Sequence, residues 1–256
     1  TLFRSEGDFI NAEKAFQESY NFRKQFFGEK HPDTARSISK LARIHSDRKE
    51  YEKSLQLTRE CFGENHPETA NAYNELGTAY SHAKKLDLAM ENYQKALSIN
   101  LKVFGENHIT VAWTYNNIGI IFGKRGLTLT KLDYYKKAHS IKKSWFGKDH
   151  SNMADSYTNL GSVYRSLNQY DKALEKLKKA LNINLRLYGE DHFRMLNSYC
   201  HIALLYENQD EFLKSLNYYY KALKIRVRSA GERHRDIANI YFHVARILNF
   251  LRDFEI

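Results

Sequence analysis

The sequence has few of the residues that interrupt helices or cross-link a chain. Its 256 residues include two prolines, two cysteines and twelve glycines. This scarcity suits long helices and excludes a collagen-like or disordered chain. Cys61 and Cys200 stand about 140 residues apart, so we expect no disulfide between them. The absence of an expected disulfide favours a reducing compartment, and we therefore expect a cytoplasmic protein.

Long apolar runs are also absent. None approaches the roughly 18 residues that a membrane-spanning helix needs, so no membrane insertion is expected. The sequence shows no signal peptide, but it starts at Thr1 without a methionine and stops at Ile256 inside a repeat. We therefore expect a fragment, with any targeting segment outside it.

Acidic residues are outnumbered, with 30 Asp and Glu against 40 Lys and Arg, for a net charge of +10. This excess favours an acidic partner. On charge alone, an acidic peptide, an anionic membrane surface and a nucleic acid all remain open.

A short motif recurs at a fixed spacing. Phe-Gly-Glu-Asn-His at residues 104–108 has near-copies along the chain, whose glycines are Gly28, Gly63, Gly105, Gly147, Gly189 and Gly231. Successive glycines are 35, 42, 42, 42 and 42 residues apart. A constant period in this range is typical of stacked repeats, in which each repeat contacts its neighbours and no single central core forms.

Each full repeat is predicted to contain two helices. The sequence His66-Pro67-Glu68 places a polar cap, a first-turn proline and an acid at a helix start. Gly105 stands where a helix end favours positive φ. The predicted organisation is one array over residues 1–256: a partial repeat at 1–28, a shortened repeat at 29–63, full repeats at 64–105, 106–147, 148–189 and 190–231, and a truncated repeat at 232–256.

Small residues mark where paired helices approach closely: Gly77 in the first helix and Ala96 in the second. An aromatic residue, Tyr80, follows three positions after Gly77. This pattern resembles the tetratricopeptide repeat, whose usual period is about 34. The 42-residue period with Phe-Gly-Glu-x-His between repeats is similar to the kinesin light chain class. The resemblance implies an all-α fold: a right-handed α-solenoid of stacked antiparallel helix pairs, the tetratricopeptide-like superhelix.

Two departures from the repeat are informative. The second helix of the shortened repeat, from Tyr51 to Phe62, is predicted to be seven residues shorter than its counterpart at 86–104. In the segment 126–131, β-branched threonines blur the turn, and Lys131 replaces an alanine. We expect fraying or a shifted helix start there.

In this architecture the first helices line the concave wall, and helix periodicity identifies the residues that face inward. The candidate peptide-binding residues are Arg36, Lys40, Arg43, Asn71, Asn74, Trp113, Asn116, Asn117, Asn159, Asn197 and His201. The first three form a basic stripe, which would select acidic side chains. Asparagine amides donate and accept, so a series of them can pair with the backbone of an extended peptide. Kinesin light chain repeats hold cargo peptides in this groove, and the resemblance implies the same use here. The alternative is that these are only solvated polar residues.

Six of the eleven histidines, His31, His66, His108, His150, His192 and His234, share one repeat position. Equivalent positions are separated by a helix-pair width, on the order of 20 Å, so these side chains cannot converge on a metal ion. We interpret them as capping and packing residues. No phosphate loop, nucleophile elbow or catalytic constellation appears. We expect no enzyme activity, cofactor or metal.

The sequence therefore predicts a non-catalytic protein–protein interaction scaffold that binds an extended, partly acidic peptide, as a cargo or signalling adaptor. A second hypothesis is a regulatory or substrate-docking array of a larger enzyme. A third is an RNA-binding helical repeat, suggested by the lysines of the second helices. Because the inner stripe varies between repeats, no nucleic acid is expected. The oligomeric state is left open.

Overall fold

A computed structural model describes residues 6–29, 31–34, 36–37, 40, 48–230 and 235–253, and these residues form helices and turns without strands. The helices are α1 (Glu6–Phe27), α3 (Arg48–Phe62), α4 (Pro67–His82), α5 (Leu86–Phe104), α6 (Ile109–Lys124), α7 (Thr128–Phe146), α8 (Ser151–Ser166), α9 (Tyr170–Tyr188), α10 (Arg194–Glu207), α11 (Phe212–Ala230) and α12 (Arg235–Asp253). The predicted all-α class is confirmed.

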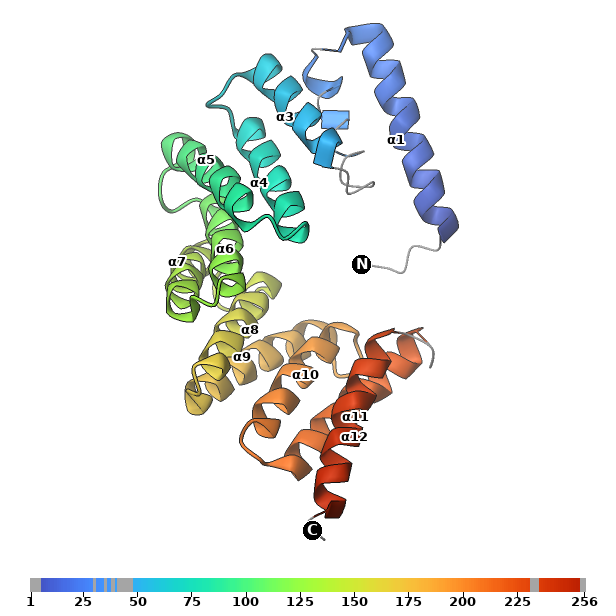
Figure 1. Ribbon diagram of the computed structural model, residues 1–256, viewed down its shortest axis with the longest axis vertical. Coiled ribbons are helices and arrows are strands. Elements are labelled where there is room, and N and C mark those ends of the chain that lie inside the picture. Colours follow the sequence, from blue (N-terminus) through green and yellow to red (C-terminus); the bar gives the residue numbers. More distant parts are fainter. Residues whose placement is uncertain are drawn as a thin grey trace. The chain divides into compact units, whose positions relative to one another are not determined.

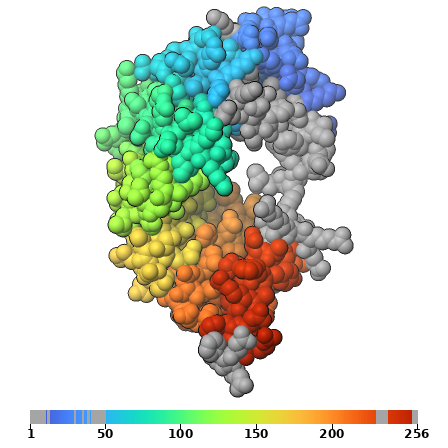
Figure 2. Space-filling model, viewed as in Figure 1, coloured from blue at the N-terminus to red at the C-terminus, as the bar shows by residue number. Residues whose placement is uncertain are grey.

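The chain divides into two compact units, Thr1–Leu127 (unit 1) and Thr128–Ile256 (unit 2). Within each unit, successive helices from α3 to α6 and from α7 to α12 pack against one another (Figure 1). The first helices of adjacent pairs also touch, α4 with α6 and α8 with α10. Figure 2 shows the same order on the surface, where colours from α3 to α6 follow the chain. The stacked helix pairs of a solenoid are thus present in both units. The single-array organisation and the handedness stay predictions.

The histidines of the repeated motif begin the first helices. His66 Nδ1 accepts a hydrogen bond from the backbone N–H of Glu68 at 3.2 Å, and its ring stacks on Phe62 with centroids 4.6 Å apart. The same pair of contacts recurs at His31, His108, His150 and His192. An accepting side chain here satisfies a backbone donor that the helix leaves unpaired. The predicted capping role is confirmed for His31, His66, His108 and His150. His192 keeps both contacts but precedes the cap residue Phe193 of α10, and His234 lies outside the described residues.

Glycines end the second helices. At the end of α5, Gly105 has a φ of 76° and donates its N–H to the carbonyl of Leu101 at 3.0 Å. Gly28, Gly63, Gly147 and Gly189 also have positive φ, from 72° to 85°. Glycine adopts this left-handed conformation without a Cβ penalty, which explains the regular glycine spacing.

The turn inside each helix pair uses a left-handed residue as well. Lys84, Gly126, Asn168 and Asp210 have φ values of 59°, 78°, 56° and 58°, at steps of 42 residues. Helix α7 begins at Thr128, 42 residues after Leu86 and 42 before Tyr170. The predicted fraying or shifted helix start at 126–131 is therefore wrong. Gly126 takes the left-handed position at no steric cost, so the turn keeps its geometry and the threonines enter the helix.

The second helix of the shortened repeat is also longer than predicted. Helix α3 starts at Arg48 and has 15 residues, whereas α5 has 19. The difference is four residues rather than seven. Arginine, lysine and glutamate at 48–50 are good helix formers, and they extend the helix by almost a turn before Tyr51.

Small residues allow the helices of a pair to approach closely. A Cβ added to Gly77 would lie 2.8 Å from the ring of Tyr93, and one added to Gly161 would lie 2.7 Å from Leu177. The buried apolar residues form separate clusters between neighbouring helices, such as Ala70, Tyr73, Ala96 and Ile99. This series of local clusters is the core that stacked repeats require.

Candidate peptide-binding trough

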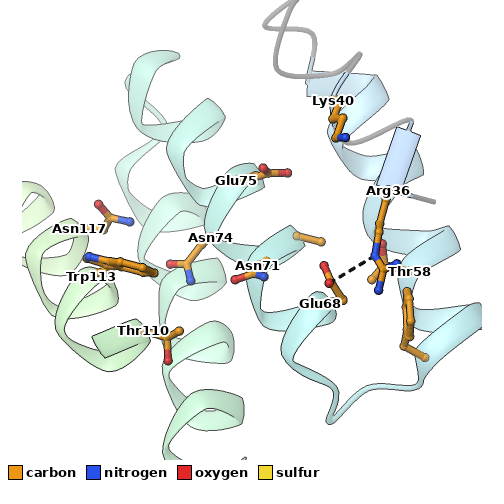
Figure 3. A pocket seen from close by; sticks show the side chains of 12 residues that line it. Arg36, Lys40, Thr58, Glu68, Asn71, Asn74, Glu75, Thr110, Trp113 and Asn117 are labelled. Carbon is orange, nitrogen blue, oxygen red and sulfur yellow. Dashed lines mark ion pairs between the residues drawn. The ribbon is translucent and has the colours of Figure 1, made fainter. Parts of the chain in front are cut away.

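Side chains from four segments of unit 1 line an open pocket of about 400 Å³. Figure 3 shows Arg36 and Lys40 on the segment before α3, with Arg36 pointing toward Glu68 of α4. The lining residues are Arg36, Lys40, Thr58, Phe62, Glu68, Asn71, Ala72, Asn74, Glu75, Thr110, Trp113 and Asn117. The structure therefore brings together six of the predicted binding residues: Arg36, Lys40, Asn71, Asn74, Trp113 and Asn117.

A second pocket, of about 430 Å³, continues along α4. It is lined by Tyr51, Asn74, Glu75, Thr78, Ala79, His82 and Asn117. Because Asn74, Glu75 and Asn117 line both pockets, the two hollows adjoin. We call their combined lining the α4–α6 trough. Its volume and its openness to solvent are suited to a short stretch of extended peptide.

The guanidinium of Arg36 is already paired within the chain. Its Nη1 lies 3.0 Å from Asp33 Oδ1, and its Nε lies 3.4 Å from Glu68 Oε1 (Figure 3). It also lies over the ring of Phe62, 5.5 Å from the centroid. The Arg36 side chain is still 47% exposed, and exposed pairs of this kind contribute only about 0–1 kcal/mol. A ligand carboxylate can therefore compete for it.

Lys40 supplies the second positive charge. Its side chain is exposed, and its ammonium lies 5.7 Å from the centroid of the Phe16 ring. The pocket also contains Glu68 and Glu75, so its two positive charges are matched by two negative ones. The positive charge expected at this end of the groove is therefore balanced by acids within the same pocket.

Asn74 is held by a polar network beneath the trough. Its Nδ2 donates to Thr114 Oγ1 at 3.2 Å, and that hydroxyl donates to the Thr110 carbonyl at 3.0 Å. Asn74 Oδ1 is buried and has no hydrogen-bond partner within the described part of the chain. Its amide is thus fixed in place and retains an acceptor at the trough wall.

Trp113 provides a large apolar surface beside these amides. It is 49% exposed, and Figure 3 shows it projecting from α6 next to Asn74. Asn71 is exposed and Asn117 is half-buried. An exposed tryptophan flanked by amides is a surface on which a peptide side chain can pack while its backbone forms hydrogen bonds.

The remaining predicted residues do not join this trough. Arg43 lies outside the described residues. Asn116 is half-buried on α6 and lines neither pocket. Asn159 on α8 is half-buried, Asn197 on α10 is exposed, and His201 on α10 is half-buried; all three belong to unit 2. Burial, and then the charge of Arg165, lowers the pKa of His201.

Sequence reasoning missed Glu68, Phe62 and Thr110 as lining residues. The sequence pattern indicates for Glu68 only a place in the first turn of a helix, which it also has. Its contact with Arg36 joins residues 32 positions apart in sequence and depends on how the segment before α3 packs against α4. Helical periodicity within one repeat carries no signal for such a contact.

A sequence model of the tetratricopeptide repeat family matches residues 1–53, 48–102, 75–128 and 132–186, and a second model of this repeat matches residues 195–236. The chain belongs to the tetratricopeptide repeat family. No curated protein matches the sequence.

Solved structures of tetratricopeptide repeat proteins related to kinesin light chain are similar to this chain. BtubC (BKLC) from P. vanneervenii matches with a TM-score of 0.70 and 22% identity, over 90% of this chain and 94% of that one. A putative kinesin light chain from Podosopora anserina, with nearly identical TPR-like repeats, matches with a TM-score of 0.61 and 14% identity, over 85% of this chain and 98% of that one. At these identities the similarity supports the fold alone.

Among the described helices of this repeat chain, none combines the length and apolar character needed to cross a bilayer. Within the same residues, no three His, Cys, Asp or Glu side chains gather closely enough to hold a metal ion.

Proposed function

We propose that this chain is a non-catalytic scaffold that binds an extended, partly acidic peptide of a partner protein in the α4–α6 trough. The observation that supports it most is the pair of adjoining pockets that share Asn74, Glu75 and Asn117. An extended peptide fits such a hollow better than a compact ligand does, because the lining runs along two helices and offers polar groups at intervals.

The amides would bind the peptide backbone. Asn71 is exposed, and Asn117 lies where both pockets meet. Each amide offers two donors and an acceptor, which match the carbonyl and N–H groups of an extended chain whatever its side chains. Trp113 would take an apolar side chain of the same peptide, and burial of this ring would supply part of the affinity.

The charges would set the preference for acidic residues. A peptide carboxylate near Lys40 gains a charge-assisted contact, and a second carboxylate would exchange with Glu68 for Arg36. Because Glu68 and Glu75 also lie in the pocket, a uniformly acidic peptide would meet repulsion. The ligand we propose is therefore partly acidic.

We further propose that the chain acts as a cargo or signalling adaptor, a role compatible with the fold that it shares with a putative kinesin light chain. Neither Cys61 nor Cys200 forms a disulfide within the described residues, which is compatible with action in the cytoplasm.

The test is a selection of short peptides from a random displayed library on the full chain, repeated with Asn117→Ala and with Trp113→Ala. The library should enrich extended sequences that combine acidic residues with one apolar residue, and both variants should lose that enrichment. Asn182→Ala on the exposed side of α9 is the matched control and should retain it. Identical enrichment on all four proteins would exclude the trough as the binding site.

A further inference from the structure

Two large cations in unit 2 occupy positions where the repeat otherwise has small or differently charged residues. Lys131 corresponds, at steps of 42 residues, to Ala89 and Ala173, which are both fully buried. Arg165 corresponds to Ser81 and, in the next repeat, to Glu207. Packing alone therefore does not require a cation at either position.

Arg165 is anchored but incompletely satisfied. Its Nη1 donates to Asn208 Oδ1 at 3.2 Å. Its Nε is buried and has no hydrogen-bond partner among the described residues. The neighbouring His201 is in the same condition, because its Nδ1 is buried and unpartnered in that part of the chain. Buried polar nitrogens without partners are uncommon in folded proteins and call for an explanation, such as a bound ion.

The positive charges of this cluster also lack a compensating acid. Arg165 is the charged group that lowers the pKa of Lys131, after burial, and it acts on His201 in the same direction. No ion pair joins Lys131, Arg165 or His201 to an acid within the described residues. The ammonium of Lys131 lies instead over the ring of Tyr135, 5.4 Å from its centroid.

We propose that Lys131, Arg165 and His201 form a binding site for a single oxyanion, a phosphate group or a carboxylate, carried by a partner protein. The oxyanion would accept hydrogen bonds from the Lys131 ammonium and from the Arg165 guanidinium. Its charge would compensate the two cations in a half-buried setting, where such contacts are stronger than at a fully exposed surface. Asn208 would hold the guanidinium in position. The site lies on α7, α8 and α10, and it is independent of the α4–α6 trough.

His201 provides a direct readout on the full chain. Sulfate, as a stand-in for a phosphate group, and acetate would each be titrated at constant ionic strength, balanced with sodium chloride. The pKa of the His201 imidazole would be followed by NMR and assigned with His201→Gln. A bound oxyanion should offset the charge of Arg165 and raise this pKa in a saturable manner. Half-saturation at a lower concentration of sulfate than of acetate would indicate a phosphorylated partner. The opposite order would indicate an acidic side chain.

Lys131→Ala is the decisive variant, because alanine is the residue that other repeats carry at this position. This substitution should lower the affinity for the oxyanion by at least about tenfold, because it removes one charge-assisted contact. Arg165→Gln should abolish saturation. Lys178→Gln removes an exposed lysine of α9 and should leave the affinity unchanged. The proposal would be overturned by a His201 pKa that neither oxyanion moves, or by equal weakening in Lys131→Ala and Lys178→Gln.

Discussion

At the scale of single residues, one histidine per repeat performs two tasks. His66 accepts a hydrogen bond from the first turn of α4 and stacks on Phe62 at the end of α3. It therefore fixes the entry angle of a helix that lines the trough. The recurrence of both contacts in other repeats explains the motif more simply than a ligand-binding role does.

His66→Ala should lower the free energy of unfolding by about 1–2 kcal/mol, because a helix cap and a ring contact are lost together. The measurement is urea unfolding monitored by circular dichroism. His82→Ala, at the exposed end of the same helix, is the control and should change stability by less than about 0.5 kcal/mol. If the two substitutions lowered the free energy of unfolding equally, His66 would have no special role as a cap.

Glu68 competes with a ligand for Arg36. Glu68→Gln removes the acid 3.4 Å from the guanidinium, and it should strengthen binding of a library-selected acidic peptide by about 2- to 5-fold, the value of an exposed ion pair. Fluorescence anisotropy of the labelled peptide measures this. Glu91→Gln, which breaks an exposed pair on α5, makes the same change in net charge away from the trough. Affinity that is unchanged or reduced by Glu68→Gln alone would contradict the competition.

A buried histidine of unit 2 couples stability to pH. Burial, and then the positive charges of Lys176, Lys143, Lys142 and Lys179, lowers the pKa of His139 to about 4, and the ring is bonded to Ser156 at 2.9 Å. In the unfolded chain the pKa of a histidine is about 6.5. As the pH falls from about 6.5 towards 4, the unfolded chain therefore gains a proton that the folded chain does not, and stability is lost.

Wild type should accordingly lose about 1–3 kcal/mol more than His139→Gln on acidification through this window. The measurement is the free energy of unfolding in urea of wild type and of His139→Gln, each at about pH 7 and about pH 5. If both proteins lost the same free energy, protonation of His139 would not be the cause.

At the scale of helices and turns, the sequence predicts what repeats and misses what joins distant positions. The helix starts at the histidines and the ends at glycines such as Gly105 were predicted, because capping depends on adjacent residues. The start of α7 was mispredicted, because the left-handed role of Gly126 becomes visible only beside Lys84, Asn168 and Asp210. The pairing of Arg36 with Glu68 depends on tertiary packing and has no local signal.

The last helix is held by one buried acid. Glu207 at the end of α10 is 7% exposed. It accepts a hydrogen bond from Tyr219 Oη at 2.8 Å, lies 3.1 Å from His243 Nδ1 and pairs with Arg246. Tyr219 belongs to α11, and the other two partners belong to α12, so a single carboxylate connects three helices.

Glu207→Ala should destabilise unit 2 by about 2–4 kcal/mol, because it removes charge-assisted hydrogen bonds and leaves their donors unpaired. Hydrogen exchange should accelerate most in α12. Glu211→Ala, which removes an exposed partner of Lys214, should cost less than about 1 kcal/mol. Unchanged exchange in α12 would show that apolar packing alone holds this helix.

At the scale of the whole molecule, both units are stacks of helix pairs, but their candidate sites differ. Unit 1 carries the α4–α6 trough, whose charges are balanced and whose amides and Trp113 suit an extended peptide. Unit 2 carries the cluster around Arg165, which suits one oxyanion. A repeat fold permits this division because each repeat keeps its packing residues and varies the others.

The most direct measurement of the central claim is the affinity of a library-selected acidic peptide for Arg36→Glu with Lys40→Glu. The control is the equal charge reversal Lys178→Glu with Lys224→Glu on the exposed sides of α9 and α11. We predict that the trough variant binds at least about tenfold more weakly with unchanged helicity, because two charge-assisted contacts become repulsive. We predict that the control binds within about twofold of wild type, a residual effect of screened long-range charge. Equal affinity of the trough variant and the control would contradict the account.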